Sequence, residues 1–390
     1  MIHARYALVR DRIHIIFGPP SRNSLGIIRS LGREGIRPVV VTLPRPKFLP
    51  FVASRYVKEI HIENDLDKCV DYIIEKYGRG GKKCFLHLTN DPIMQECDKR
   101  YDELKDLFYL FHGEGQGALS RYFGKKVQCD LAKACGLPTP GYEVVARGEM
   151  PQTLHYPIYV KCMDSFGAWK EDMEICRTPE ELREAYNHLV SDQWLMQDFI
   201  DKQTEVSLQG ISVRGGEQVY MPYKKAYTRL RDKDYGTYMY YDANDLPDSL
   251  IDGIRRVIRA IHFSGCFEIE FLQDKQGNLF FLEINLRYSG SNQGMDCGGV
   301  NLPLEWALSE LTGSIDESAI SLRGERFYVM NDFLDIPLML HGKVSFFKWL
   351  HDFWRADCYY VLDWRDLKPP LVYGYNCVCR KLGRFFKPGA

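Results

Sequence analysis

The sequence predicts an α/β protein that opens with a doubly wound parallel sheet and continues in an α+β arrangement. Three observations support this prediction. The chain has 390 residues, enough for two or three domains, and its 45% hydrophobic content is ordinary for a globular protein. An apolar run to Phe17, a Gly-Pro-Pro turn, a helical pattern to Leu31 and the apolar run 38–43 indicate strand, turn, helix and strand. Residues 265–285 have the pattern of a two-stranded hairpin.

Residues 1–118 are expected to form a Rossmann-like N-terminal domain, because helical and apolar stretches keep alternating as far as residue 111. This alternation alone also allows a nicotinamide-dependent oxidoreductase. However, Gly18 and Gly26 frame the stretch "GPPSRNSLG", which lacks the three-glycine fingerprint of dinucleotide binding. Its two prolines also remove backbone donors that would face a pyrophosphate. The turn therefore disfavours NAD or NADP.

Charge and cysteine content exclude several classes of protein. The 51 Lys and Arg against 52 Asp and Glu create no overall field that would recruit nucleic acid. The first apolar run is too short for a signal-peptide core, and nowhere do 18 apolar residues run together, so we expect a cytoplasmic protein without a transmembrane segment. The 12 cysteines never show the two-residue spacing of zinc or redox motifs. Neither disulfides nor zinc are predicted.

Two further units and a tail follow the first domain. Residues 119–195 hold strands around a helix whose start is marked by Thr178 as N-cap and Pro179 at the first helical position. Residues 196–322 hold a strand meander, a helix and the hairpin. Residues 323–390 are expected to form an aromatic and basic C-terminal extension.

The hairpin carries an acid, an amide and a base on one face. Side chains alternate along a strand, so Glu283, Asn285 and Arg287 share one side. Folding the hairpin about its glycine turn places Glu270 opposite Glu283 and Glu268 opposite Asn285. Like charges across a ladder need a counter-charge, and an oxygen set without His or thiolate favours magnesium over zinc. A solvated face on a slipped hairpin is the alternative that spacing leaves open.

The stretch "FEIEFLQDKQGNLFFLEINLRYSGS" resembles the metal-binding segment of the ATP-grasp superfamily, where an acid lies thirteen residues before a Glu-x-Asn element. The matching residues are Glu270, Glu283 and Asn285, and the arginine that follows in the carboxylate–amine ligase branch is matched by Arg287. The resemblance implies that the two acids and the amide hold Mg²⁺, or Mn²⁺ in its place, against the phosphates of ATP. It also implies that Arg287 meets an acyl phosphate or a carboxylate. A salt bridge from Arg287 to Glu268 or Glu283 is its alternative role.

The resemblance extends to the nucleotide side of the site. Lys125 lies eleven residues before Gly136 and Lys161 ends an apolar strand, two positions where the family has phosphate-binding lysines. Further matches imply a hinge for adenine, a ribose contact and a second basic residue facing the phosphates. These are Asp198, Phe199 and Ile200 for adenine, Glu205 for ribose and Lys225 for phosphate. In this scheme residues 119–195 are the lid subdomain and residues 196–322 the metal- and phosphate-binding subdomain.

The sequence departs from the family at the loop after the strand lysine. The family usually has a glycine-rich loop that closes over phosphate, whereas "CMDSFGAWKED" contains only Gly167. Backbone amides need glycine for a close approach to phosphate. We therefore expect Ser165 or Lys170 to assist.

The function that the resemblance implies is ATP-dependent ligation of a carboxylate to an amine. The carboxylate would attack ATP, and the amine would then attack the acyl phosphate, giving an amide or peptide bond with ADP and phosphate. Positioning and charge neutralisation provide most of the catalysis in such phosphoryl transfers. An amino acid or peptide is the expected substrate class. An ATP-binding regulatory or scaffold module without ligation is the alternative.

The tail raises a separate question. Many aromatic residues and eight Lys or Arg residues cluster in residues 346–390, the stretch that ends the chain. Aromatic side chains of this size most often bury against a neighbouring domain or subunit, and we expect docking onto the rest of this chain or a partner copy. Peripheral contact with anionic lipid is the alternative. A homo-oligomer is compatible with either.

Overall fold

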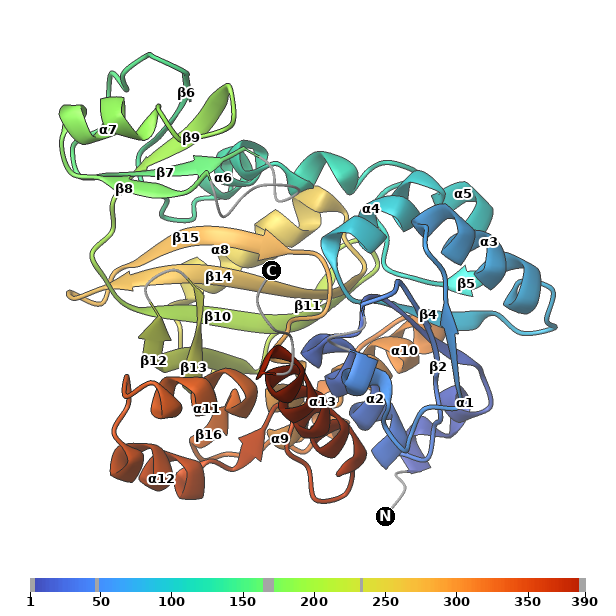
Figure 1. Cartoon of the computed structure of the whole chain (residues 1–390). Coiled ribbons are helices and arrows are strands. Elements are labelled where there is room, and N and C mark those ends of the chain that lie inside the picture. The colour runs from blue at the N-terminus through green and yellow to red at the C-terminus, as the bar shows by residue number, and fades with distance from the viewer. Residues whose placement is uncertain (1–3, 46–48, 164–171, 232–233, 386–390) are drawn as a thin grey trace.

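The computed structural model describes residues 4–45, 49–163, 172–231 and 234–385. Within these ranges the chain forms sheets of five, eight and four strands. Figure 1 shows the N-terminal sheet in blue at the right, the large sheet at the centre and the small green sheet at the upper left.

The N-terminal sheet has the order β3-β2-β1-β4-β5, and neighbouring strands are parallel. This order confirms the predicted Rossmann-like sheet. The residues of β1, β2 and β4 are buried, as expected for a parallel sheet covered on both faces. The strands are β1 (His14–Phe17), β2 (Val39–Thr42), β3 (Glu59–Ile62), β4 (Cys84–Leu88) and β5 (Phe108–Tyr109).

Short helices connect these strands, and local capping explains where two of them start. The Ser21 hydroxyl accepts a hydrogen bond from the Ser24 N–H at the start of α2, and the Asp65 carboxylate accepts from Asp67 and Lys68 at the start of α3. The helices are η1 (Ala4–Tyr6), α1 (Ala7–Arg10), α2 (Arg22–Arg33), η2 (Leu49–Val52), α3 (Leu66–Tyr77), α4 (Asp91–Lys99) and α5 (Tyr101–Leu104).

The small sheet is antiparallel, with the order β6-β9-β7-β8, and has a hydrophobic cluster of its own around Trp194. The predicted cap is confirmed, because the Thr178 hydroxyl accepts from the Glu181 N–H at the start of α7. The elements are η3 (Ser120–Phe123), α6 (Lys125–Ala134), β6 (Tyr142–Ala146), β7 (Ile158–Cys162), β8 (Glu174–Cys176), α7 (Pro179–Ala185) and β9 (Gln193–Asp198).

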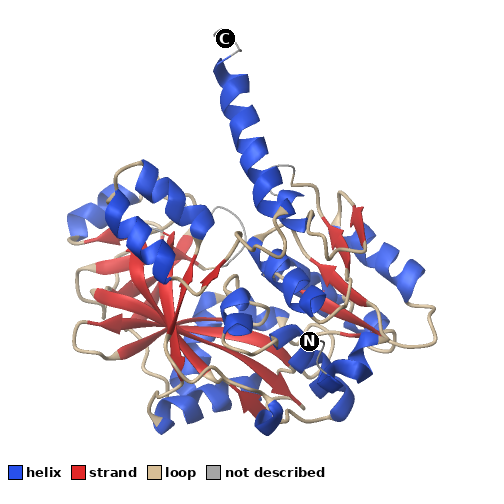
Figure 2. Ribbon diagram, turned by 90° about the horizontal axis from the view of Figure 1, so that it is seen from below, coloured by secondary structure: helices blue, strands red, loops and turns tan. Residues whose placement is uncertain are grey.

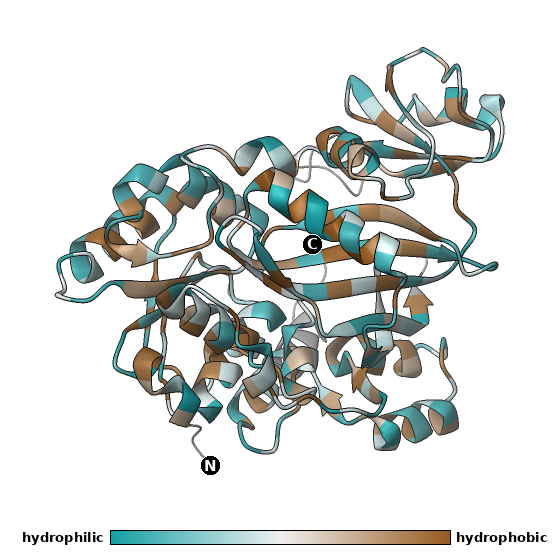
Figure 3. Ribbon diagram, turned by 180° about the vertical axis from the view of Figure 1, so that it is seen from behind, coloured by the Kyte–Doolittle hydropathy of each residue, from teal (hydrophilic) through white to brown (hydrophobic). Residues whose placement is uncertain are grey.

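The large sheet has the order β15-β14-β10-β12-β13-β16-β17, and β11 pairs with β10. Its strands are β10 (Lys202–Val213), β11 (Gln218–Tyr220), β12 (Tyr223–Arg231), β13 (Asp234–Ala243), β14 (Gly265–Asp274), β15 (Leu279–Asn285), β16 (Phe327–Met330) and β17 (Cys358–Tyr359). Its helices are α8 (Asp248–Ile261), α9 (Asn292–Cys297), α10 (Leu302–Thr312) and η4 (Glu317–Ala319). Figure 3 shows hydrophobic residues concentrated along these strands.

The N-terminal and large sheets share one hydrophobic core. Trp306 of α10 is fully buried in it, and its ring centroid lies 4.7 Å from that of Phe111 and 5.7 Å from that of Phe85. Both phenylalanines come from the first 111 residues, so the aromatic contacts join the two sheets into one packed body.

The C-terminal segment docks onto this body. It adds β16 and β17 to the large sheet, and the ring of Tyr373 packs against Phe333 and Phe51, with centroids 4.6 and 5.5 Å away. The expectation that the tail docks onto the rest of the chain is confirmed for this part. The helices are α11 (Asp332–Leu340), α12 (Phe346–Arg355) and α13 (Lys368–Phe385). None of the described helices combines the length and apolar character needed to span a membrane.

A buried ion pair fastens this segment to the N-terminal sheet. Arg29 of α2 and Asp366 are both buried, and Arg29 Nε lies 3.1 Å from Asp366 Oδ2. The guanidinium also donates to the carbonyl oxygens of Tyr360, Val361 and Asp366. The hydrogen bonds that the Arg29 guanidinium donates therefore all go to residues 360–366 of the C-terminal segment.

Removing this pair is expected to destabilise the protein strongly. Asp366→Ala leaves the buried Arg29 charge with a 3.8 Å contact to Asp363 in place of its 3.1 Å pair, and breaking such a buried pair costs about 3–5 kcal/mol of unfolding free energy. Urea denaturation measures the loss. Asp201→Ala is the matched control, because the Asp201–Lys275 pair is exposed and such pairs contribute about 0–1 kcal/mol. Equal losses in both variants would contradict the proposed role of Arg29.

Candidate active site

The candidate site is built on the hairpin of β14 and β15. Glu270 lies opposite Glu283, and Glu268 lies opposite Asn285, which confirms the predicted register. Pairing of β14 with β10, and of β10 with β12, extends the row that begins at Glu283 and Glu270 as far as Lys225. Because directly opposed residues share a face, these acids, the amide and the lysine line one side of the large sheet.

The register of β15 is held from outside the sheet. This strand lies at the sheet edge, where nothing pairs with its outer side within the described sheet. The Gln128 side chain of α6 takes that place: its Nε2 donates to the Ile284 carbonyl at 3.0 Å and its Oε1 accepts from the Ile284 N–H at 3.1 Å. Two hydrogen bonds to one residue oppose the slip that would turn Glu283 and Asn285 away.

Glu268 and Lys225 form a buried ion pair at the centre of this face. Lys225 Nζ donates to Glu268 Oε1 at 2.8 Å and to Ser291 Oγ at 3.0 Å. Burial acts to raise the pKa of Glu268, but the charges of Lys225 and Arg287 outweigh it and lower that pKa. Burial likewise acts to lower the pKa of Lys225, and the Glu268 charge raises it well above its usual value. Both groups are therefore charged at neutral pH.

Glu270 and Glu283 are held together without a cation from the described residues. Asn285 Nδ2 donates to Glu270 Oε1 and to Glu283 Oε1, both at 3.1 Å. Neither carboxylate forms an ion pair with a described residue. Burial raises the pKa of Glu270 well above its usual value, and the charges of Glu268 and Glu283 raise it further. Ionising both acids would therefore create an excess of negative charge that the described side chains do not neutralise.

This charge excess is what a hard divalent cation would relieve. Two carboxylates and an amide oxygen are donors that magnesium accepts. Among the described residues, no three His, Cys, Asp or Glu side chains are grouped as a metal site, and the predicted set has only two acids, completed by Asn285. The residues therefore fit a cation that takes its remaining ligands from elsewhere, such as substrate phosphates.

Arg287 lies between two acids at the end of this face. Its Nε is 3.5 Å from Asp91 Oδ1, and its Nη1 is 3.9 Å from Glu268 Oε2. Asp91 begins α4 of the N-terminal domain, whereas Arg287 follows β15 of the large sheet. The guanidinium therefore links these two parts of the molecule. The pKa of Asp91 is raised, mainly by burial. The charge of Arg287 acts to lower this pKa, and the charge of Glu283 raises it further. The alternative salt bridge to Glu268 is present only as a long contact.

Two lysines come from the small sheet and the helix before it. Lys161 of β7 is 4% exposed, and its pKa is lowered to about 8, mainly by burial and also by the charge of Lys125. The charge of Glu283 acts in the opposite direction, which places Lys161 within electrostatic reach of the hairpin. Lys125 begins α6, and its Nζ lies 3.7 Å from Cys162 Sγ. Two ammonium groups thus converge where the described residues supply no anion within salt-bridge distance.

Tyr159 also indicates that the small sheet lies close to the acids of the large sheet. It lies two residues before Lys161 on β7, so both side chains share one face of the small sheet. Burial raises the pKa of Tyr159 to about 12, and the charges of Glu205 and Glu283 contribute. The face of the small sheet that bears Lys161 therefore lies over the acids of the large sheet.

The predicted adenine hinge connects the two sheets. Asp198 ends β9, and its carboxylate accepts from the Gly141 N–H at 3.1 Å and the His155 N–H at 3.2 Å. The Phe199 N–H donates to the Pro157 carbonyl at 3.1 Å. These bonds hold the link to the small sheet, so Asp198 and the Phe199 N–H already have partners.

Glu205 and Ile200 lie just beyond the hinge. Glu205, on β10, forms an ion pair with Lys202, three residues earlier on the same strand. Ile200 is half-buried at the start of the large sheet. The roles of both residues toward a nucleotide stay predictions.

Comparison with curated proteins gives partial matches. N5-carboxyaminoimidazole ribonucleotide synthase of Staphylococcus epidermidis is 29% identical over 139 residues, which are 34% of this chain and 35% of that protein. The mitochondrial propionyl-CoA carboxylase alpha chain of Mus musculus is 24% identical over 210 residues, 47% of this chain and 28% of that protein. The matches thus span about a third of these relatives' own length. No family model matches the chain.

Solved structures resemble much more of the chain. N5-carboxyaminoimidazole synthetase from Staphylococcus aureus covers 85% of both chains with a TM-score of 0.66 and 17% identity. L-amino acid ligase from Bacillus licheniformis covers 80% of this chain and 78% of its own, with a TM-score of 0.61 and 16% identity. The biotin carboxylase domain of the Hydrogenobacter thermophilus 2-oxoglutarate carboxylase, in complex with MgADP and bicarbonate, covers 81% and 73%, with a TM-score of 0.62 and 18% identity. These neighbours are ATP-grasp enzymes.

The chain has the ATP-grasp fold. The predicted fold class is therefore confirmed, including the N-terminal Rossmann-like sheet that precedes the ATP-grasp sheets.

One side of the candidate site was not found from the sequence. The strands β1 and β4 end beside the loop after β15, where Asn23 Nδ2 donates to the carbonyl oxygens of Thr89 and Tyr288, both at 2.7 Å. Buried polar atoms gather at this edge without a hydrogen-bond partner in the described chain. They are Arg22 Nη1, Asn23 Oδ1, Thr89 Oγ1, Asn90 Oδ1, Asp91 Oδ1, Asn292 Oδ1 and Nδ2, and Gln293 Oε1. Unsatisfied buried groups are rare, and a polar ligand at the carboxyl ends of these parallel strands would satisfy them.

The turn after β1 is shaped for close packing against that edge. A Cβ at Gly18 would lie 1.6 Å from Thr89 Oγ1, so only glycine allows β1 and β4 to end side by side here. Strand packing thus explains the glycine at this turn. A signal for this edge in the sequence is the position of Asn23 and Asp91 at the starts of the helices that follow β1 and β4.

The lid loop cannot be compared with its prediction. Ser165, Gly167 and Lys170 lie in residues 164–171, outside the described residues.

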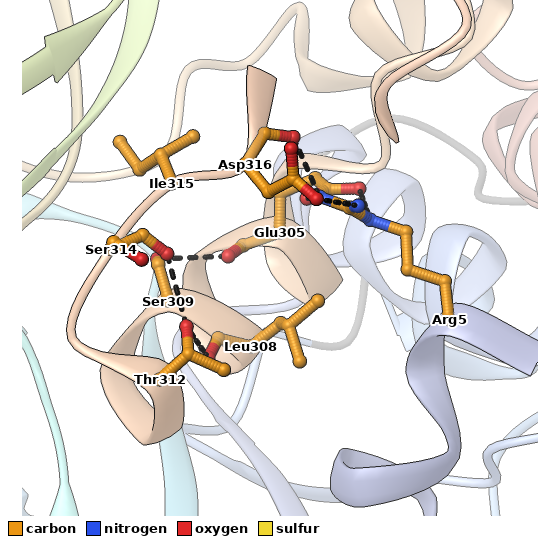
Figure 4. A pocket seen from close by; sticks show the side chains of 8 residues that line it. All are labelled: Arg5, Glu305, Leu308, Ser309, Thr312, Ser314, Ile315 and Asp316. Atoms are coloured by element: carbon orange, nitrogen blue, oxygen red, sulfur yellow. Dashed lines mark hydrogen bonds and ion pairs between the residues drawn. The ribbon is translucent and has the colours of Figure 1, made fainter. Parts of the chain in front are cut away.

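A cavity of about 210 Å³ lies apart from the ATP-grasp site, between η1 and α10 (Figure 4). Glu305 is its buried acid. Arg5 donates to Glu305 Oε2 at 2.7 Å and Tyr6 donates to Glu305 Oε1 at 2.6 Å. The acid is already satisfied, so the cavity presents no free charge to a ligand.

The buried Lys161 predicts a pH dependence of stability. Its pKa is about 8 in the folded protein against 10.5 in the unfolded chain, so between these pH values the unfolded chain binds more protons. The stability contributed by this group therefore rises with pH in that window, by up to about 3 kcal/mol. Lys161→Met should lose this rise.

Urea denaturation at pH 7.5 and at about pH 10 measures the difference, because other groups titrate equally in both proteins. Lys126→Met is the control, since Lys126 is half-exposed and forms only a surface pair with Asp130. Parallel stability curves for wild type and Lys161→Met would contradict a buried Lys161.

Proposed function

We propose that this protein is a cytoplasmic ATP-dependent carboxylate–amine ligase, which forms an amide or peptide bond through an acyl phosphate and releases ADP and phosphate. One observation carries the proposal: among the described residues, the Glu270–Glu283 pair meets no cation, and Lys161 and Lys125 above it meet no anion within salt-bridge distance. A nucleotide triphosphate with a divalent cation supplies both. The likeness to an L-amino acid ligase and to N5-carboxyaminoimidazole synthetase supports the reaction class.

The nucleotide would lie between the small and the large sheet. Lys125 and Lys161 would bind its phosphate oxygens, and the backbone near Ile200 would meet adenine together with the Asp198 and Phe199 link. Glu205 would meet the ribose if it exchanges its ion pair with Lys202. Each lysine would gain a charge-assisted hydrogen bond that its apolar surroundings strengthen.

Glu270, Glu283 and Asn285 would hold Mg²⁺, or Mn²⁺ in its place. When bound, such a cation polarises phosphate oxygens and neutralises their charge. Asn285 already draws the two carboxylates together through its Nδ2. Its side chain thus sets the spacing of the two acids before any ligand arrives.

Lys225 takes a positioning role in this proposal. Its ammonium is buried against Glu268 and Ser291, so it orients the acid beside the metal set and holds the loop after β15. Arg287 would meet the carboxylate or the acyl phosphate, since its planar guanidinium binds such groups with two parallel bonds. It is partly exposed, and its contacts with Asp91 and Glu268 measure 3.5 and 3.9 Å, so a substrate anion would bind beside these two acids.

The second substrate would bind toward the N-terminal sheet. The unsatisfied atoms of Asn23, Asn90 and Asn292 offer both donors and acceptors there, which suits a polar amine such as an amino acid or peptide. This placement sets the amine beside Arg287, where the acyl group would be activated. The residues hold two substrates close together and contribute no covalent nucleophile.

Glu283→Gln should remove ligase turnover. The change deletes one charge and almost no volume, so ADP release with mixed amino acids should fall by roughly two orders of magnitude or more. The thermal midpoint should stay near that of wild type. Glu217→Gln is the control, because Glu217 is exposed and pairs only with Arg214. Full turnover in Glu283→Gln would rule out the metal set.

Lys161→Ala should weaken nucleotide binding. Loss of one charge-assisted hydrogen bond of about 1.5–3 kcal/mol lowers the affinity for a non-hydrolysable ATP analogue by roughly 10- to 100-fold. Isothermal titration calorimetry measures the change. Lys126→Ala, next to Lys125 but paired with Asp130, should bind as wild type does. Unchanged affinity in Lys161→Ala would place the phosphates elsewhere.

A further inference from the structure

The C-terminal segment has an outer surface that its docking does not cover. Phe347, Trp354 and Trp364 are 81%, 77% and 76% exposed, and Leu340, Phe346 and Leu371 are more than half exposed. These six residues belong to α11, α12, α13 and the loop before α13. We call them the aromatic surface. So many large apolar side chains on one short segment mark an interaction site.

The acids of this segment have partners within the molecule. Residues 332–376 contain six aspartates and no glutamate, and all six have partners inside the molecule. Asp335 and Asp352 pair with Arg229, Asp332 accepts from the Val361 and Leu362 N–H groups, Asp357 pairs with Arg323, and Asp363 and Asp366 pair with Arg33 and Arg29.

The basic residues of the same segment are exposed instead. Lys343, Lys348, Arg355, Arg365 and Lys368 all lie on the outside, interleaved with the aromatic side chains. The outward face of the segment is therefore both hydrophobic and positively charged. This combination is typical of protein surfaces that enter the headgroup region of an anionic membrane.

Helix α12 shows how the segregation arises. Each helical residue turns by about 100°, so Trp354 lies nearly opposite Asp352, and Phe347 lies close to the same stripe as Trp354. Asp352 is buried against Arg229 of β12, which orients the helix so that this stripe faces outward. The Ser345 hydroxyl caps the helix by accepting from the Lys348 N–H at 3.3 Å. The internal Arg229–Asp352 ion pair thus determines which face of α12 is turned outward.

Helix α13 adds length to the same region. It continues for 18 residues from Lys368, and Figure 2 shows it projecting from the body as a single helix. Its first part is held through Tyr373, which packs against Phe51 and Phe333.

We propose that the aromatic surface and its lysines and arginines bind the surface of an anionic phospholipid membrane, so that the protein is peripherally attached. The basic residues distinguish this partner from a second copy of the chain. A two-fold interface would set like charges against each other, and interface cores are depleted of lysine. Anionic headgroups complement the same charges, while Trp and Phe insert among the acyl chains. The proposal does not depend on the ligase activity.

Co-sedimentation with vesicles tests the proposal. The full-length protein should sediment with vesicles of phosphatidylglycerol and phosphatidylcholine, and far less with phosphatidylcholine alone or at high salt. The double variant Phe347→Ser/Trp354→Ser should reduce binding by roughly tenfold or more. The double variant Lys343→Glu/Lys368→Glu should do the same, and both should keep the wild-type thermal midpoint because the side chains are exposed.

The matched control is Lys105→Glu/Lys275→Glu, which reverses two exposed lysines elsewhere and should bind vesicles as wild type does. Absence of vesicle binding by the wild type would overturn the proposal, as would equal binding by all three variants. Sedimentation velocity without lipid tests the other partner, a second copy of the chain. A wild-type dimer that dissociates in Phe347→Ser/Trp354→Ser would assign the aromatic surface to that second copy and overturn the membrane proposal.

Discussion

The site depends on how three carboxylates share one face of a sheet. Glu268, Glu270 and Glu283 lie within two rows of the same hairpin, and their mutual repulsion must be balanced. The buried ammonium of Lys225 balances Glu268. The remaining pair is held by one amide, Asn285, and keeps its excess charge. That excess makes the face a place for a cation and a polyanion rather than an ordinary solvated strand surface.

Each neighbouring part of the molecule serves this face in a different way. Helix α6 fixes the edge strand through Gln128, and the small sheet brings Lys161 over the acids. The N-terminal sheet contributes Asp91 beside Arg287 together with a set of unsatisfied polar atoms. The C-terminal segment adds β16 and β17 at the end of the large sheet opposite β15, and it is fastened to the N-terminal domain by Arg29. The membrane surface proposed for this segment would therefore lie away from the β14–β15 hairpin.

Prediction from the sequence was most successful where the interactions are local. The hairpin register follows from strand alternation and one glycine turn, so the opposition of Glu270 to Glu283 was predictable and is confirmed. The helix start at Thr178 follows from a capping pattern of the same kind. The need for glycine at position 18 was not predictable in this way, because it comes from contact with Thr89, which lies 71 residues further along the chain. The roles of Lys125, Lys161, Asp198, Phe199, Ile200, Glu205 and Lys225 toward substrates stay predictions.

The sequence by itself determined the fold class, the hairpin and the identity of the acids and the amide, because periodicity and spacing along one strand decide which side chains share a face. Only the tertiary structure decided which charges are neutralised. Lys225 meets Glu268 across 43 residues, Arg287 meets Asp91 across nearly 200, and Arg29 meets Asp366 across 337. Such pairs depend on how separate sheets pack, and the desolvation that makes them strong exists only once the core has formed.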